Sequence, residues 1–194
     1  MKKLLAIITV SLCFIIPSQA DNIRDFQIEG MSIGDSALNY FSEKEIKKNI
    51  RIAYKKKDFT HVENNNYSFF KTFDAVDINF KTGDTEYKIQ SLSGVINYRN
   101  KSMIECKKQL KEIFNEMSGM FPKWKKVAIS TSVMKQMDPS GKSKQTWGGF
   151  FSDQGSITVG CVDYSTETFP KSMDHLDLTI RTEEFNNFLR FAYQ

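Results

Sequence analysis

One long amphipathic segment, residues 102–121, constrains the fold of this chain more than any other feature. Ser102 and Glu105 have the spacing of a capping box at its start, and Pro122 follows its end. Its apolar side chains recur every three or four residues, the period of a helix with one buried face: Met103, Cys106, Leu110, Ile113, Phe114, Met117 and Phe121. The sequence therefore predicts one long helix that must bury this face against another layer.

The partner layer is a sheet, because most other runs of the chain alternate polar and apolar residues with a period of two. A hairpin is predicted from residues 76–80 to 87–90, with its turn at 81–84, and its return strand can continue through a bulge at 93–94 to Tyr98. Further strands are expected over residues 127–133, 146–152, 156–164 and 176–180, and short helices over 36–41, 43–52 and 183–192. Hairpins dominate this order. The prediction is an α+β domain with a mainly antiparallel sheet, one long helix packed on one face and short terminal helices.

The first twenty residues have the organisation of a secretory signal peptide. Lys2 and Lys3 precede an apolar run over residues 4–16, and small residues precede an expected cleavage site after Ala20. The apolar run is short for a membrane span. We therefore expect a periplasmic or secreted protein with no stable membrane span after cleavage, in which residues 21–194 form a single domain of 174 residues.

Charge and motif content argue against several classes of function. The net charge is +4, and the loss of Lys2 and Lys3 lowers it to +2, which is too weak to favour a nucleic-acid partner. With only His61 and His175, a zinc site would need carboxylates at unpatterned spacings. No glycine-rich phosphate loop links a strand to a helix. The sequence thus predicts no metal, no cofactor and no nucleic acid.

Two cysteines remain after the expected cleavage, Cys106 and Cys161. Cys106 lies on the apolar face of the long helix, and Cys161 shares one face of a strand with Ile157 and Val159. If the helix packs on that face, both thiols point into the same layer, and in an oxidising compartment such a pair forms a disulfide. The alternative is two buried, unpaired thiols that pack as small apolar side chains.

The motif that most suggests catalysis is Gly-Asp-Ser at residues 34–36. It resembles the GDS(L) block of the GDSL-type esterases, in which this serine is the nucleophile, and the resemblance implies a secreted serine hydrolase that uses Ser36. The resemblance covers three residues. Ala37 replaces the leucine of the block, and Ser172 stands three residues before His175, where the family has an aspartate.

A different interpretation accounts for the same residues. Without a base in hydrogen-bond reach a serine is a weak nucleophile, whereas Asp35 and Ser36 are suited to cap a short helix. A hydrolase could also be built on unpatterned carboxylates such as Asp163 and Asp177. We favour the helix cap and keep the hydrolase as the alternative.

A wider stretch, residues 30–36, has the pattern G-M-x-x-G-x-S. It resembles the entry of small secreted bacterial modules, including BamE-like envelope lipoproteins, and the whole chain resembles secreted periplasmic proteins of marine alphaproteobacteria. Neither resemblance carries an activity. With the export signal and no assembled catalytic set, we expect a periplasmic, non-enzymatic module that binds an envelope protein or a small ligand.

The candidate binding surface is the run from Trp147 to Phe151, Trp-Gly-Gly-Phe-Phe. Two glycines inside a strand permit a bulge or a close backbone approach. The aromatic side chains of Trp147, Phe150 and Phe151 could then form a surface for a ligand or partner. The alternative is that they belong to the core, because the chain is rich in phenylalanine, with 16 in total.

Overall fold

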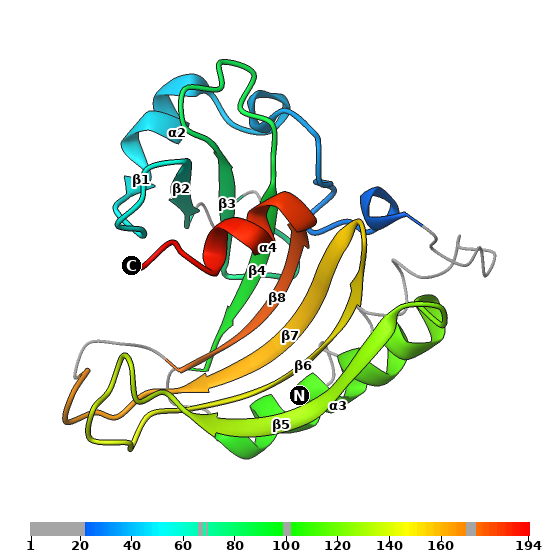
Figure 1. Cartoon of the computed structure of the whole chain (residues 1–194), viewed down its shortest axis with the longest axis vertical. Coiled ribbons are helices and arrows are strands. Elements are labelled where there is room, and N and C mark those ends of the chain that lie inside the picture. The colour runs from blue at the N-terminus through cyan, green and yellow to red at the C-terminus, as the bar shows by residue number, and fades with distance from the viewer. Residues whose placement is uncertain (1–21, 66–67, 69, 99–101, 170–173) are drawn as a thin grey trace.

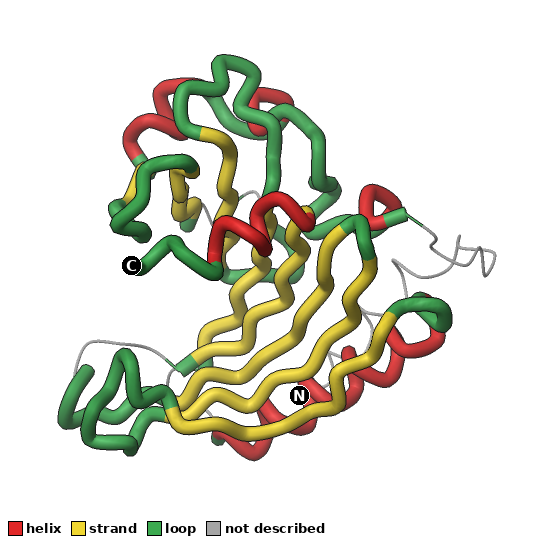
Figure 2. Tube along the Cα trace, viewed as in Figure 1, coloured by secondary structure: helices red, strands yellow, loops and turns green. Residues whose placement is uncertain are grey.

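Eight strands form one antiparallel sheet in the order β1-β2-β3-β4-β8-β7-β6-β5 (Figures 1 and 2). The computed structural model describes residues 22–65, 68, 70–98, 102–169 and 174–194. The strands are β1 (Ile50–Arg51), β2 (Phe59–Asn64), β3 (Ala75–Lys81), β4 (Ser91–Asn97), β5 (Lys125–Val133), β6 (Lys144–Ser152), β7 (Gly155–Asp163) and β8 (His175–Thr182). The predicted α+β class with an antiparallel sheet is confirmed.

Two four-stranded meanders, β1–β4 and β5–β8, make up the sheet and meet where β4 pairs with β8. The helix α3 (Met103–Met120) connects them. The other helical elements are η1 (Ile23–Asp25), η2 (Ala37–Asn39), α2 (Glu43–Lys48) and α4 (Glu183–Leu189). Because the last strand returns to the middle of the sheet, β8 lies between β4 on one side and β7 on the other.

The helix α3 begins and ends as its sequence predicts, with one difference at the start. The Ser102 hydroxyl accepts from the N–H of Ile104 and not from that of Glu105, so the cap forms without the reciprocal box. Four side chains of the apolar face are buried: Cys106, Leu110, Phe114 and Met117. The Phe114 ring lies 5.0 Å from that of Phe150 on β6.

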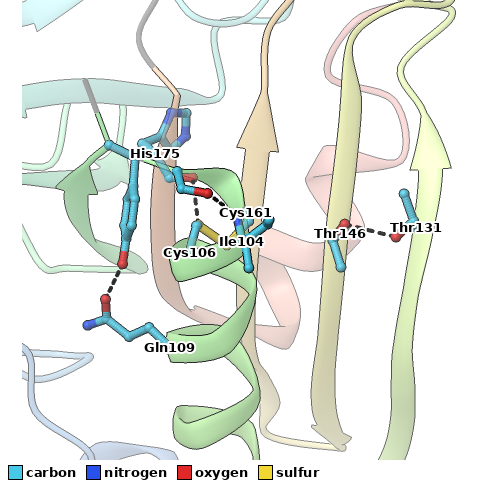
Figure 3. Close-up of a disulfide and its surroundings, with 9 residues drawn as sticks. Ile104, Cys106, Gln109, Thr131, Thr146, Cys161 and His175 are labelled. Carbon is cyan, nitrogen blue, oxygen red and sulfur yellow. Dashed lines mark hydrogen bonds between the residues drawn. A yellow bond between two sulfur atoms is a disulfide. The ribbon is translucent and has the colours of Figure 1, made fainter. Parts of the chain in front are cut away.

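Cys106 of α3 and Cys161 of β7 form the predicted disulfide, with 6.1 Å between their Cα atoms (Figure 3). This separation is within the usual range of about 4.4–6.8 Å. Cys161 faces α3 because it alternates on β7 with Thr158 and Gly160, which point to the other side. The bond therefore ties α3 to the sheet face that carries the core.

The predicted hairpin is correct in its later part and wrong at the start of its return strand. β3 pairs with β4, which lies within the expected continuation to Tyr98, with Asn79 opposite Ser91. The segment 87–90 instead pairs with the N-terminal segment: Ala37 N–H donates to the Tyr87 carbonyl, and the Ile89 N–H donates to the Asp35 carbonyl. Tyr87 has a positive φ of 50°, which turns the chain away from β3.

Two opposite faces of the sheet have different chemistry. The face that contacts α3, called the α3 face here, carries apolar side chains such as Ile157, Leu176 and Ile180. The opposite face is crossed by α4, whose Asn186 accepts a hydrogen bond from Ser156 of β7 (3.1 Å), and is called the α4 face (Figure 1). Polar residues dominate the α4 face, because they alternate with the core residues along each strand.

The predicted signal peptide, residues 1–20 with cleavage after Ala20, lies outside the described residues. Among the residues that the structure describes, no helix is both long enough and apolar enough to cross a membrane.

Candidate functional site

A cavity of about 330 Å³ opens on the α4 face, where β6, β7 and β8 lie side by side. Two aromatic residues of β6 and two charged residues of β8 stand on opposite sides of it. Its lining consists of Gln145, Trp147, Phe151, Thr158, Val159, Gly160, Asp177 and Arg181. None of these positions belongs to a loop, so regular strands hold the whole site.

The strand register explains how these side chains come together. Trp147, Gly160 and Asp177 lie in one row across β6, β7 and β8. Phe151 and Arg181 lie in a second row, with Ser156 between them. Each row therefore places one aromatic side chain opposite one charged side chain. In the first row Gly160 leaves the space between them open, whereas in the second row Ser156 is buried and donates a hydrogen bond to Asn186 of α4.

Gly160 is required for this arrangement. A Cβ atom at Gly160 would lie 2.7 Å from Asp177 Oδ1 and 3.4 Å from Trp147 Cβ. The Asp177 carboxylate thus leans over the bare backbone of β7, in space that any other residue would fill.

Arg181 is partly buried, and its side chain makes no hydrogen bond or ion pair with any residue that the structure describes. Burial lowers the pKa of its guanidinium, while the nearby Asp177, Tyr54 and Tyr193 act in the opposite direction. A guanidinium in such a site favours a planar anion that accepts two parallel hydrogen bonds.

Only one of the two carboxylate oxygens of Asp177 accepts a hydrogen bond from the described residues. Its Oδ2 accepts from the Thr179 hydroxyl at 3.3 Å, and Thr179 in turn shares a hydrogen bond of 2.8 Å with Ser93 of β4. Asp177 Oδ1 is buried and has no hydrogen-bond partner among the described residues. Leaving a buried acceptor unpaired costs about 1–3 kcal/mol, and more for a charged group.

A second acidic residue, Asp77 of β3, lies on the same face beyond β4, directly opposite Glu63 of β2. Burial first, and then the charges of Glu63 and Asp177, raise the pKa of Asp77 to about 7. The proton that Asp77 retains reduces the negative charge beside the cavity at neutral pH.

Asp77 should therefore make stability depend on pH. In the folded protein it keeps its proton to about pH 7, whereas its ordinary pKa is 3.8, so its stabilising effect is present below about pH 4 and is lost as the pH rises through 7. We expect Asp77→Asn to remove this decline and to be more stable than wild type at about pH 8 by up to about 4 kcal/mol, measured by urea unfolding. Asp153→Asn, in an exposed turn, is the control; an unchanged decline in Asp77→Asn would contradict this assignment.

The three aromatic residues of the predicted binding surface separate onto two faces. Trp147 and Phe151 line the cavity on the α4 face. Phe150 is 1% exposed and packs against Phe114 and Phe121 on the α3 face. The prediction that all three share a surface is therefore wrong for Phe150, because neighbouring residues of a strand point to opposite faces.

Ser36 caps η2, as predicted. Its hydroxyl accepts from the Leu38 N–H at 3.2 Å and donates to the Glu86 carbonyl at 2.6 Å. The predicted cap by Asp35 is wrong: its carboxylate closes a turn by accepting from the Ser32 N–H at 2.9 Å, and also accepts from the Tyr40 hydroxyl at 2.7 Å. The proton of Ser36 is thus held by a backbone carbonyl and not by a histidine.

We expect Ser36→Ala to lower the free energy of unfolding by about 1 kcal/mol, the usual loss for a cap, without changing the rate of p-nitrophenyl acetate hydrolysis. Ser132→Ala, at an exposed position of β5, is the matched control for stability. Loss of esterase activity in Ser36→Ala alone would restore the hydrolase interpretation.

The carboxylates considered for a second hydrolase site do not converge. Asp177 lies on the α4 face. Asp163 is two positions after Cys161 on β7 and therefore lies on the opposite face, the α3 face. Within the described ranges, no group of three or more histidine, cysteine or acidic residues is placed to hold a metal ion.

Gln145 and Gly160 were not predicted, and Arg181 is the charged residue of the site that no sequence motif indicated. It ends the polar series His175, Asp177, Thr179 and Arg181 that alternates with the buried residues of β8. Comparison with protein-family models, with curated proteins and with solved structures finds no match to this chain. Its function must therefore be inferred from the chemistry of the site.

Proposed function

We propose that this chain is an exported, non-enzymatic binding module whose ligand site is the cavity on the α4 face. The observation that carries the proposal is the Arg181 guanidinium, which lines the cavity without a hydrogen-bond or ion-pair partner among the described residues. Removing a cation from water without a partner is costly. A ligand with an anionic group offsets this cost, so Arg181 supplies both affinity and orientation.

The size and lining of the cavity favour a small ligand over a protein partner. A volume of about 330 Å³ lies at the lower end of the range for small-molecule sites, about 300–1,000 Å³. Such sites combine apolar walls with a few placed polar groups. Trp147 and Phe151 supply the apolar wall here, and Gln145, Asp177 and Arg181 supply the polar groups.

In this proposal α3 is the single long helix that packs on the rear of the site. Its disulfide to Cys161 and the packing of Phe114 on Phe150 hold β7 and β6 from behind. Sites on strands that are supported in this way are more precise than sites on loops. Export through residues 1–20 places the ligand in the periplasm or outside the cell and gives the disulfide an oxidising compartment.

Fluorescence of Trp147 tests the proposal. Trp124→Phe removes the second tryptophan, which packs on Phe121 away from the cavity. In that background we expect N-acetyl-L-phenylalanine, an anion with one ring, to produce a saturable change of emission. Arg181→Gln should weaken this binding at least ten-fold, while Arg190→Gln, an exposed arginine, should leave it unchanged. No saturable change, or equal binding by Arg181→Gln, would contradict the proposal.

A further inference from the structure

We infer that the ligand of the cavity is a small zwitterion, a free amino acid or a dipeptide, with its carboxylate at Arg181 and its ammonium at Asp177. This inference rests on the proposed function and specifies the class of ligand. A zwitterion fits if Asp177 needs a hydrogen-bond donor and if one small molecule can reach both Asp177 and Arg181. The cavity must also have room for the side chain of the ligand.

The reason for the ammonium group is the free oxygen of Asp177. Ionised Asp can only accept hydrogen bonds, and Oδ1 accepts none from the described residues. The side-chain amide of Gln145 also lies above Gly160, with Nε2 3.6 Å from the position of a Cβ atom there, but it does not donate to Asp177 Oδ1. The side-chain torsion χ2 of aspartate is soft, so the carboxylate can turn its free oxygen from the strand toward the cavity that it lines. A ligand N–H group then supplies the donor that the protein lacks.

The separation of the two charges fits a small molecule. Asp177 and Arg181 are four residues apart on one face of β8, and a strand rises about 3.3 Å per residue, so their Cα atoms are about 13 Å apart. Both residues line the same cavity, and no ion pair joins them within the described structure. A ligand with both charges can bridge them, and each protein charge then gains an opposite partner.

The rest of the ligand lies against β6. Trp147 is in the row of Asp177, and Phe151 is in the row of Arg181. Between these rings, β6 carries Gly149 on the same face, so no side chain of β6 separates them. A ligand that spans the two charges therefore rests its side chain on this aromatic wall, which favours an apolar or aromatic amino acid.

Four related probes test the inference by calorimetric titration: L-phenylalanine, glycyl-L-phenylalanine, N-acetyl-L-phenylalanine without the ammonium, and L-phenylalaninamide without the carboxylate. We expect at least one of the two zwitterions to bind at least ten-fold more tightly than both blocked probes. Asp177→Asn should remove the advantage of that zwitterion over N-acetyl-L-phenylalanine, and Arg181→Gln should remove its advantage over L-phenylalaninamide. The better of the two zwitterions distinguishes the amino acid from the dipeptide.

The outcomes separate this inference from the proposed function. If N-acetyl-L-phenylalanine binds as tightly as both zwitterions and Arg181→Gln weakens its binding, the inference of a zwitterionic ligand is wrong. The proposed anion site at Arg181 is then still supported. If no probe binds the wild-type protein, both are wrong. The comparison of probes on wild-type protein needs no variant, so it remains valid even if Asp177→Asn unfolds, which circular dichroism would reveal.

Discussion

We expect reduction of the Cys106–Cys161 disulfide to lower the free energy of unfolding by up to about 4 kcal/mol. The two cysteines are 55 positions apart, and a cross-link across a loop of this size restricts the unfolded chain by roughly that amount, with strain and residual structure reducing it. A typical domain has only about 5–15 kcal/mol in total. The measurement is urea unfolding with and without reductant.

A double variant, Cys106→Ala with Cys161→Ala, separates loss of the bond from other effects of the reductant. It should be destabilised to a similar extent as the reduced wild type, and reductant should not change it further. Peptide mapping of the unreduced protein should find the two cysteines in one linked fragment. Two separate, alkylated cysteines in that map would contradict the disulfide.

We expect Phe150→Ala to lower the free energy of unfolding by about 3–5 kcal/mol, the usual loss for a large aromatic residue of the core. Phe150 is 1% exposed, and its ring lies 5.0 Å from that of Phe114 and 6.2 Å from that of Phe121. Removing it leaves a cavity between β6 and α3. Thermal or urea unfolding measures this loss.

Phe151→Ala is the matched variant, because it makes the same change one position further along β6. Phe151 is partly buried and lines the cavity, so we expect a loss of stability of about 1 kcal/mol or less and weaker binding of N-acetyl-L-phenylalanine. Equal destabilisation by the two variants would contradict the assignment of these side chains to opposite faces.

The fold could largely be predicted from periodicity. The long helix, most strands of the second meander and the cap by Ser36 follow from local patterns, because burial of one face sets the spacing of apolar residues. β2 was missed: its sequence, Phe-Thr-His-Val-Glu-Asn, mixes polar and apolar residues on both faces. The connection after β3 was misplaced because Lys81–Asp84 looks like a tight turn, whereas the contacts that redirect the chain come from residues 35 and 37, far away in sequence.

The candidate site could be predicted only in part. The local run of aromatic residues around two glycines indicates Trp147 and Phe151 as a binding surface, and both line the cavity. The strand alternation could also have separated Phe150 from them. The pairing of Trp147 with Gly160 and Asp177 could not be read from the sequence, because it depends on the order and register of β6, β7 and β8. One feature of the sequence could have indicated the site. Gly160 is a glycine inside a strand, and such a glycine often marks a position where another group approaches the backbone.

A ¹H–¹⁵N spectrum recorded during titration with L-phenylalanine and N-acetyl-L-phenylalanine tests directly whether the cavity on the α4 face is a ligand site. We expect saturable shifts of the Trp147 indole N–H and of the backbone amides of Thr158, Gly160 and Asp177, with the Trp124 indole unmoved. Shifts confined to residues outside the cavity, or no saturable shift with either probe, would contradict the proposed ligand site.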